Sequence, residues 1–422
     1  MATMASLSPP PLELLPAYSA SITRPAPSAL RPRQPEVVER KFPLAQIRKE
    51  PWAYLIVRSR GGSSNDRPQY FQGEDVQGSV EMDVPKGDTA IRSVEVSVRG
   101  HLVSGPSPRS PNAAKTTFLN ISRVLWSGDK LSGVNRWDFT LKLPTECGID
   151  AENEDPQQKW PLPPSFMEQE ARFGIHYEIF LHVRRGLLRG DSRLNITFNY
   201  SPLVFPEAPS ALRQLAYREN IAHLIGPSGD PHGWKALPLI KMQGTVFSSR
   251  LIEANCILSL ATPLCYTRST VIPLRLTIQT DDAQSLHLLS TTKAPIVRLM
   301  RHSSNYTKIA ANTPDNLITS PDDFNTESRI VDTAIWWPAN EGDTPPNSRT
   351  LNGELRVPGN LKPACIFGFA KISYAVVLQP FRAIAFSPSA KPREYLASQP
   401  IEIATAFPLG PRPRSMAPPA YS

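Results

Sequence analysis

The chain has 422 residues, 45 of them proline, with 40% hydrophobic and 20% charged residues and a formal net charge of +8. Proline at about twice its average usage argues against long helices, because proline breaks the helical hydrogen-bond ladder. No apolar stretch reaches the roughly 18–20 residues of a membrane-spanning helix, and no apolar run of signal-peptide length precedes the first prolines. The four cysteines form no C-x-x-C pair, so we expect reduced thiols and a cytoplasmic protein.

The positive charge lies at the two ends of the chain. Residues 1–60 hold nine Lys and Arg against four Glu, and residues 380–422 hold five against two, so the middle is neutral. A nucleic-acid-binding domain more often carries its basic surface within the folded body, so we expect no nucleic acid partner. We interpret the basic ends as solvated tails, with weak contact to an anionic membrane surface as the alternative.

The amino-terminal half divides into a tail and a run of strands. Residues 1–49 are rich in Pro, Ser, Ala and Arg without a hydrophobic period, and are predicted to be disordered. Residues 50–206 alternate apolar and polar positions between Gly- and Pro-containing turns, which indicates a β-sandwich or barrel. The clearest strands are IRSVEVSVRG (91–100), WDFTLKL (137–143) and GIHYEIFLHVRR (174–185).

A linker is predicted over residues 207–236. Within it, one side of a short helix over residues 209–224 could be lined by apolar side chains. These are Leu212, Leu215, Ala216 and Ile221.

Alternation then resumes over residues 237–407, which we predict to be a second β-sandwich. A long polar stretch, residues 301–328, has few strand signals and is predicted as a loop, and residues 408–422 as a second disordered tail. The predicted strands are LIEANCILSL (251–260), VIPLRLTIQ (271–279), AKISYAVVL (370–378) and PIEIATAF (400–407).

The two halves carry the same local pattern before one strand. LPPSF (162–166) precedes a strand containing Ile-x-Tyr at Tyr177, and LKPACIFG (361–368) precedes one containing Ile-x-Tyr at Tyr374. Proline suits a strand entrance because it cannot donate to the ladder, and a tyrosine ring can pack inward while its hydroxyl finds a polar partner. The match indicates a duplicated β-sandwich.

Three segments, in this order, resemble the arrestin family. They are YFQGEDVQGSVEMDVPKGDTAIRSVEVSVRGH (70–101), VLWSGDKLSGVNRWDFTLKLP (124–144) and RTLNGELRVPGNLKPACIFGFAKISYAVVL (349–378). The likeness is close over residues 50–206 and looser over residues 237–386, and it is most similar to the α-arrestin group, abundant in fungi. It implies two tandem immunoglobulin-like β-sandwich domains, the arrestin fold, with disordered Pro-rich tails. No counterpart of the buried charged switch of visual and β-arrestins is evident, so phosphate-sensing activation is not carried over.

Both tails contain a proline-tyrosine string. The chain ends in PPAY, with Pro418, Pro419 and Tyr421, which is a P-P-x-Y motif. Such a peptide pre-forms a polyproline II helix, which suits the aromatic groove and tyrosine pocket of a WW domain. The amino-terminal LPAY is a degenerate copy, in which the corresponding residues are Leu15, Pro16 and Tyr18.

The resemblance implies a non-enzymatic adaptor in trafficking and ubiquitination. In this interpretation the sandwiches engage cytoplasmic tails of membrane transporters or receptors, and the tails recruit a WW-domain HECT-type ubiquitin ligase that promotes endocytosis at plasma or endosomal membranes. An arrestin-fold structural subunit of a vesicle coat, without ligase recruitment, is the alternative. An enzyme with a site assembled from distant residues is a third reading that nothing in the sequence supports.

No catalytic, cofactor or metal motif is found. His176 and His182 lie on the same face of one predicted strand, but six residues of strand span about 20 Å, which is too far to share an ion. We therefore interpret both histidines as structural.

Overall fold

The computed structural model describes residues 37–44, 51–61, 67–85, 91–105, 108, 110, 113–149, 158–168, 171–186, 190–306, 324–339, 345–392 and 394–419. Residues Val37–Ser422 belong to one compact unit. The described chain is nearly all β, as predicted, with two short α-helices. Neither of these helices is long enough to cross a membrane.

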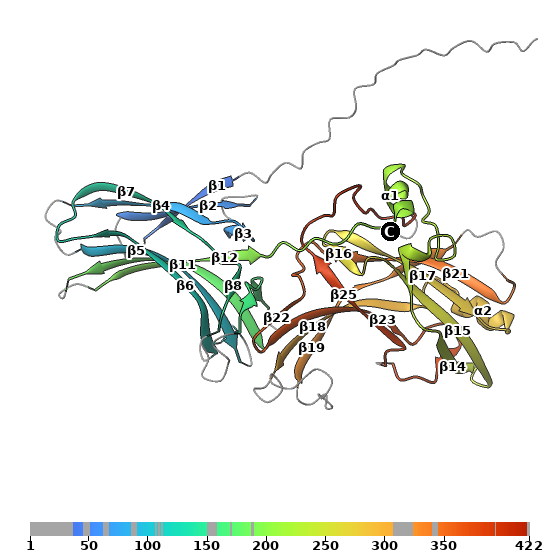
Figure 1. Ribbon diagram of the computed structural model, residues 1–422. Helices are drawn as coiled ribbons and strands as arrows, with labels where there is room; N and C mark the ends of the chain where they lie inside the picture. Colours follow the sequence, from blue (N-terminus) through green and yellow to red (C-terminus); the bar gives the residue numbers. More distant parts are fainter. Residues whose placement is uncertain are drawn as a thin grey trace, which may run out of the picture. The chain divides into compact units, whose positions relative to one another are not determined.

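The strands of the first sandwich form one curled sheet of order β6-β5-β11-β12-β3-β2-β4-β7, with β1 beside β2 and β10 beside β11, and a separate β8-β9 pair (Figure 1). Their bounds are β1 Val37–Pro43, β2 Ala53–Arg60, β3 Gln69–Phe71, β4 Val76–Val84, β5 Ile91–Ser104, β6 Ala114–Ser127, β7 Gly133–Leu141, β8 Glu146–Cys147, β9 Trp160–Pro161, β10 Phe166–Met167, β11 Phe173–Arg185 and β12 Ser192–Ser201.

The second sandwich has two sheets, β20-β21-β17-β15-β14-β24 and β16-β25-β23-β18-β19, with β13 beside β15 and β22 beside β23. Its elements are the helices α1 Ala211–Arg218 and α2 Ala283–Leu289, the 3-10 helix η1 Pro231–Gly233, and the strands β13 Trp234–Ala236, β14 Ile240–Val246, β15 Arg250–Ala261, β16 Cys265–Thr267, β17 Thr270–Gln279, β18 Ile296–Tyr306, β19 Phe324–Thr333, β20 Ile335–Pro338, β21 Ser348–Val357, β22 Cys365–Phe367, β23 Ala370–Gln379, β24 Phe386–Pro388 and β25 Ala397–Ala404.

The two sandwiches have the same topology. The series β6-β5-β11-β12-β3 of the first corresponds, strand for strand and in chain order, to β19-β18-β23-β25-β16 of the second. The opposite layers correspond as well, since β1-β2-β4-β7 matches β14-β15-β17-β21. In both, one short strand pairs in parallel, β3 with β12 and β16 with β25, whereas the other pairings are antiparallel. The predicted duplication is therefore present in the topology of the chain.

The repeated tyrosine is buried and hydrogen-bonded in both halves. The Tyr177 hydroxyl donates to the Pro163 carbonyl at 2.5 Å, and the Tyr374 hydroxyl donates to the Lys362 carbonyl at 2.7 Å. In each half the accepting residue directly follows the Leu of the Leu-x-Pro segment. The same bond thus joins the strand entrance to the central strand twice, as the sequence pattern predicted.

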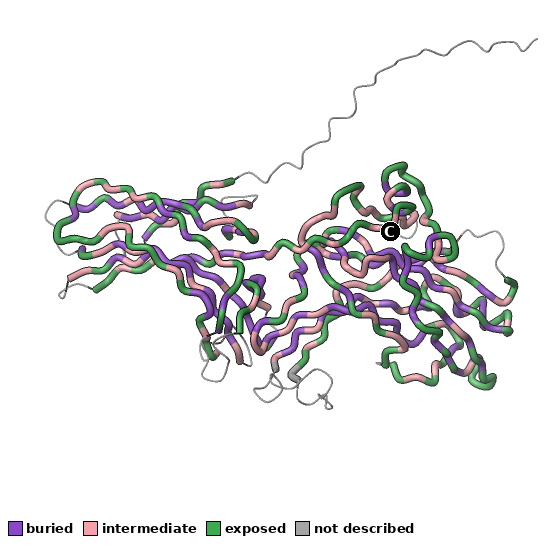
Figure 2. The backbone as a smooth tube through the Cα atoms, viewed as in Figure 1, coloured by how far each residue is buried: buried purple, intermediate pink, exposed green. Residues whose placement is uncertain are grey.

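The predicted strands show the alternation of buried and exposed residues that their sequences led us to expect (Figure 2). The inward positions of β5, β11, β15, β17 and β23 are buried, because successive side chains of a strand point to opposite faces. In β5, for example, Val94, Val96 and Val98 have no exposed surface.

Three boundaries differ from the prediction. Val37–Pro43, placed in the disordered tail, form β1, because they pair residue for residue with β2. The predicted loop over residues 301–328 is shorter, since β18 and β19 extend into it, and residues 307–323 lie outside the described residues. The second sandwich begins at Trp234, where β13 pairs with β15.

The helix of the linker is shorter than predicted and turns a different side inward. It covers Ala211–Arg218, with Ser210 as its amino-terminal cap, rather than residues 209–224. The side chains of Leu212 and Leu215 are 39% and 42% exposed, whereas Arg213, Ala216 and Tyr217 are buried.

Candidate functional site

The structure describes part of the predicted WW-binding residues. Pro418 is half-buried and Pro419 is exposed, whereas Tyr421 lies outside the described residues. Leu15, Pro16 and Tyr18 of the amino-terminal copy also lie outside them. The described site is therefore the C-terminal segment, residues 408–419, and the surface of the second sandwich that it contacts.

Glu354 holds the C-terminal segment. Its two carboxylate oxygens accept hydrogen bonds from the Ser415 hydroxyl at 2.6 Å and from the Met416 backbone N–H at 2.5 Å. A hydrogen bond to a charged group contributes roughly 1.5–3 kcal/mol when it is intact. The segment predicted to be a disordered tail is thus attached to the sandwich up to Met416, two residues before the P-P-x-Y motif.

The position of Glu354 follows from the alternation of β21. Leu351 and Leu355 on this strand are buried in the core, so Glu354 points to the outer face of the sheet. The residue is nevertheless only 3% exposed. A glutamate on an outer face remains buried only when something covers it, and the covering atoms include those of Ser415 and Met416.

Burial and hydrogen bonding act on Glu354 in opposite directions. Burial raises the pKa of the Glu354 carboxyl, and the bonds donated by Ser415, Met416 and Ala417 lower it, with burial the larger effect. The anchor is therefore a desolvated carboxylate that depends on its donors, because a buried charge without partners is strongly unfavourable.

Other contacts extend the attachment along the segment. The Arg414 guanidinium donates to the Ile221 carbonyl at 3.1 Å, and the Arg412 guanidinium lies 4.6 Å from the centre of the Phe407 ring. Met416 lines a small cavity together with Trp234 and Trp337.

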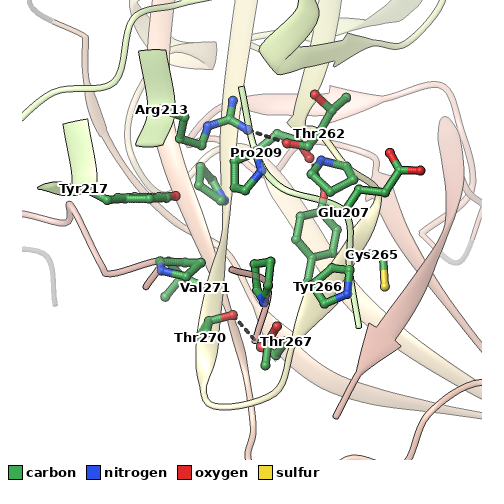
Figure 3. Close-up of a pocket in the computed structure, with 16 residues that line it drawn as sticks. Glu207, Pro209, Arg213, Tyr217, Thr262, Cys265, Tyr266, Thr267, Thr270 and Val271 are labelled. Atoms are coloured by element: carbon green, nitrogen blue, oxygen red, sulfur yellow. Dashed lines mark hydrogen bonds between the residues drawn. The ribbon is translucent and has the colours of Figure 1, made fainter. Parts of the chain in front are cut away.

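A second cavity joins the segment to the linker (Figure 3). The labelled side chains come from the linker, from helix α1 and from the ends of β15, β16 and β17. With a volume of about 40 Å³, it is far smaller than the ~300–1,000 Å³ of a small-molecule site. Its walls are rich in proline: Pro206, Pro209, Pro263, Pro273, Pro408 and Pro413. We interpret it as a packing contact of rigid segments.

Arg213 explains why the helix turns its charged side inward. Its guanidinium donates to the Thr262 carbonyl at 2.7 Å (Figure 3) and to the Gly233 carbonyl, and lies 4.9 Å from the Trp234 ring. Burial lowers the pKa of Arg213, which stays cationic because an arginine starts from about 12.5. These carbonyls belong to η1 and to the residue after β15, outside helix α1, which is why helical periodicity alone did not predict the burial of Arg213.

Comparison with models of known protein families and with curated proteins finds no match for this chain. The resemblance to arrestins therefore depends on the sequence segments alone.

Proposed function

We propose that this protein is a non-enzymatic adaptor of the α-arrestin type. In this proposal the two sandwiches engage the cytoplasmic tail of a membrane transporter or receptor, and the C-terminal motif recruits a WW-domain HECT-type ubiquitin ligase to it. The protein would act in the cytoplasm and on plasma or endosomal membranes, promoting endocytosis of the bound cargo.

The observation that carries the proposal is the position of the motif on a duplicated fold. Pro418 and Pro419 directly follow a segment that Glu354 anchors to the second of two β-sandwiches whose core strands share the same order. A polyproline II peptide has no internal hydrogen bonds, and it binds when its prolines fit into the aromatic groove of a partner. A motif directly after an anchored segment stays close to the sandwich that would hold cargo, and because Pro418 is half-buried there, release of the segment would give a WW domain full access to it.

The degenerate amino-terminal copy adds a second contact to the proposal. If Leu15, Pro16 and Tyr18 also bind, a ligase with several WW domains would engage both tails of one chain. Two weak contacts then reinforce each other through their effective concentration.

A binding experiment tests the proposal. Full-length protein and a peptide of residues 410–422 are titrated with purified WW domains, beside the variants Tyr421→Ala and Tyr18→Ala. Tyr421→Ala should abolish binding of the peptide and leave at most the weak amino-terminal contact in the full chain. Wild-type and Tyr421→Ala proteins that bind equally poorly would contradict ligase recruitment, and capture of coat subunits instead would favour the structural alternative.

A further inference from the structure

Two histidines and a glutamate come together on the outer face of the first sandwich. His101 on β5 lies directly opposite His176 on β11 in the antiparallel register, and Glu178 follows His176 by two residues. The three side chains therefore share one face of the sheet. Their potential ligand atoms all lie within 4.8 Å of one another.

The polar atoms of this group lack ordinary partners. His101 Nε2, His176 Nδ1 and Glu178 Oε2 are buried and have no hydrogen-bond partner among the described residues. His101 is 5% exposed and Glu178 is 8% exposed. The distance from His101 Nε2 to Glu178 Oε2 is 3.6 Å, which is too long for a hydrogen bond. Three buried polar atoms without partners in one small group of side chains need a further explanation, since most such atoms are satisfied.

The spacing suits a small ion. Ligands at 2.0–2.1 Å from a tetrahedral zinc lie roughly 3.3 Å from one another. The distances are 3.6 Å from His101 Nε2 to Glu178 Oε2 and 4.0 Å from His176 Nε2 to Glu178 Oε1, so binding of an ion would require the three side chains to adjust toward one common point. The His176 side chain is 20% exposed, so solvent reaches this group of side chains at His176.

The Thr117 hydroxyl lies beside the ring of His101, with its Oγ1 3.1 Å from Nδ1. Neutral imidazole is the ligand form. The tautomer that carries its proton on Nδ1 can donate to this hydroxyl, and its Nε2 lone pair is then available to a metal ion.

Cations compete for the carboxylate. Lys115 Nζ lies 3.6 Å from Glu178 Oε2, with the Lys115 side chain 46% exposed and that of Glu178 11% exposed. Arg99 lies directly opposite Glu178 in the register of β5 and β11, and its guanidinium is 4.4 Å from the centre of the Phe180 ring. Binding of an ion would displace Lys115 toward water.

We propose that His101, His176 and Glu178 bind one divalent transition-metal ion, with Zn²⁺ the ion that two imidazoles and a carboxylate suit best. Three protein ligands leave a fourth position for water. The ion would link β5 to β11 within the first sandwich, and it has no part in WW-domain recruitment.

The test uses the full chain, titrated with Zn²⁺ against a competing chelator and with Co²⁺, whose visible spectrum reports tetrahedral coordination. The wild type should bind one ion with the tetrahedral Co²⁺ spectrum. His176→Ala should weaken binding at least ~10-fold, since losing even an outer partner of a ligand costs ~10–100-fold. Glu178→Gln keeps the shape of the side chain and should weaken binding as well.

His182→Ala is the matched control. The His182 side chain is 21% exposed on the same strand and is paired with Asp191 at 2.8 Å. This variant should bind Zn²⁺ as the wild type does. Absence of one-equivalent binding in the wild type, or equal losses in His176→Ala and His182→Ala, would overturn the assignment.

Discussion

Ser415→Ala should strengthen binding of a WW domain to the full-length protein, although Ser415 lies outside the P-P-x-Y motif. The substitution removes the 2.6 Å bond to Glu354 and leaves a buried carboxylate with one donor fewer. The loss is about 1.5–3 kcal/mol of attachment, and each 1.4 kcal/mol is a factor of ten in the docking equilibrium. Release of the segment exposes Pro418, which is half-buried in the docked state.

The magnitude follows from the competition between docking and binding. When only a fraction of the chains has the motif released, the apparent dissociation constant is the intrinsic one divided by that fraction. We therefore expect the wild-type protein to bind WW domains more weakly than the free peptide of residues 410–422, and Ser415→Ala to bind at least about ten-fold more tightly than wild type. Ser415→Asp should reach the affinity of the peptide, because it places a second negative charge beside Glu354.

Isothermal titration calorimetry with one WW domain measures these affinities. Peptides with and without the Ser415→Ala change are the control and should bind equally, which separates docking from direct contact. If wild-type protein, Ser415→Ala protein and free peptide all bind with the same affinity, then docking does not compete with the WW domain and the reasoning is refuted.

Three further predictions concern stability. Tyr177→Phe and Tyr374→Phe should each lower the free energy of unfolding in urea by about 1–2 kcal/mol, because each leaves a buried or half-buried carbonyl without its donor; a loss in only one would contradict an equivalent role. Burial raises the pKa of the Glu354 carboxyl above 4.5, so this group stabilises the fold most below pH 4.5, and that stabilisation is lost as the pH rises through the raised pKa. A glutamine does not titrate, so the free energy of unfolding of Glu354→Gln, measured relative to wild type, should increase as the pH rises toward neutral. Parallel pH profiles of the two proteins would count against this. Arg213→Ala should lose about 2–4 kcal/mol in the same urea assay through its two carbonyl partners, whereas exposed Arg218→Ala on the same helix should change stability by less than ~0.5 kcal/mol; equal effects would show that burial of Arg213 does not matter.

The strands and the duplication could be predicted because both leave local signals. The period of two marks each half-buried strand, and the Leu-x-Pro and Ile-x-Tyr pattern recurs at equivalent places. Tyr177 and Tyr374 then make the same bond in the structure. A register between neighbouring strands leaves no such local signal, so the sequence does not predict that His176 lies opposite His101.

The attachment of the C-terminal segment could not be predicted from the sequence. Glu354 has the sequence surroundings of an ordinary outward-pointing residue of a strand, and its partner Ser415 lies 61 positions further along the chain. Proline-rich composition favours disorder when a segment cannot bury enough surface by itself. Here Glu354 of the second sandwich accepts hydrogen bonds from the segment. The prediction of disorder from composition was therefore wrong for residues 408–419. The buried side of helix α1 could not be predicted for a similar reason, because Arg213 is buried where it donates to carbonyls that lie outside the helix.

The fold and the proposed motif place opposite demands on the backbone. A sandwich satisfies its N–H and C=O groups within its sheets, whereas a polyproline II peptide satisfies none internally and must leave the sheets to meet a groove. The hydrogen bonds to the Glu354 side chain are compatible with both requirements. They fix the position of the segment, and they leave Pro418 and Pro419 outside the strands. Since one of these bonds is donated by the Ser415 hydroxyl and both are accepted by the Glu354 carboxylate, we expect a change of charge at Ser415 to alter the access of a partner to the motif.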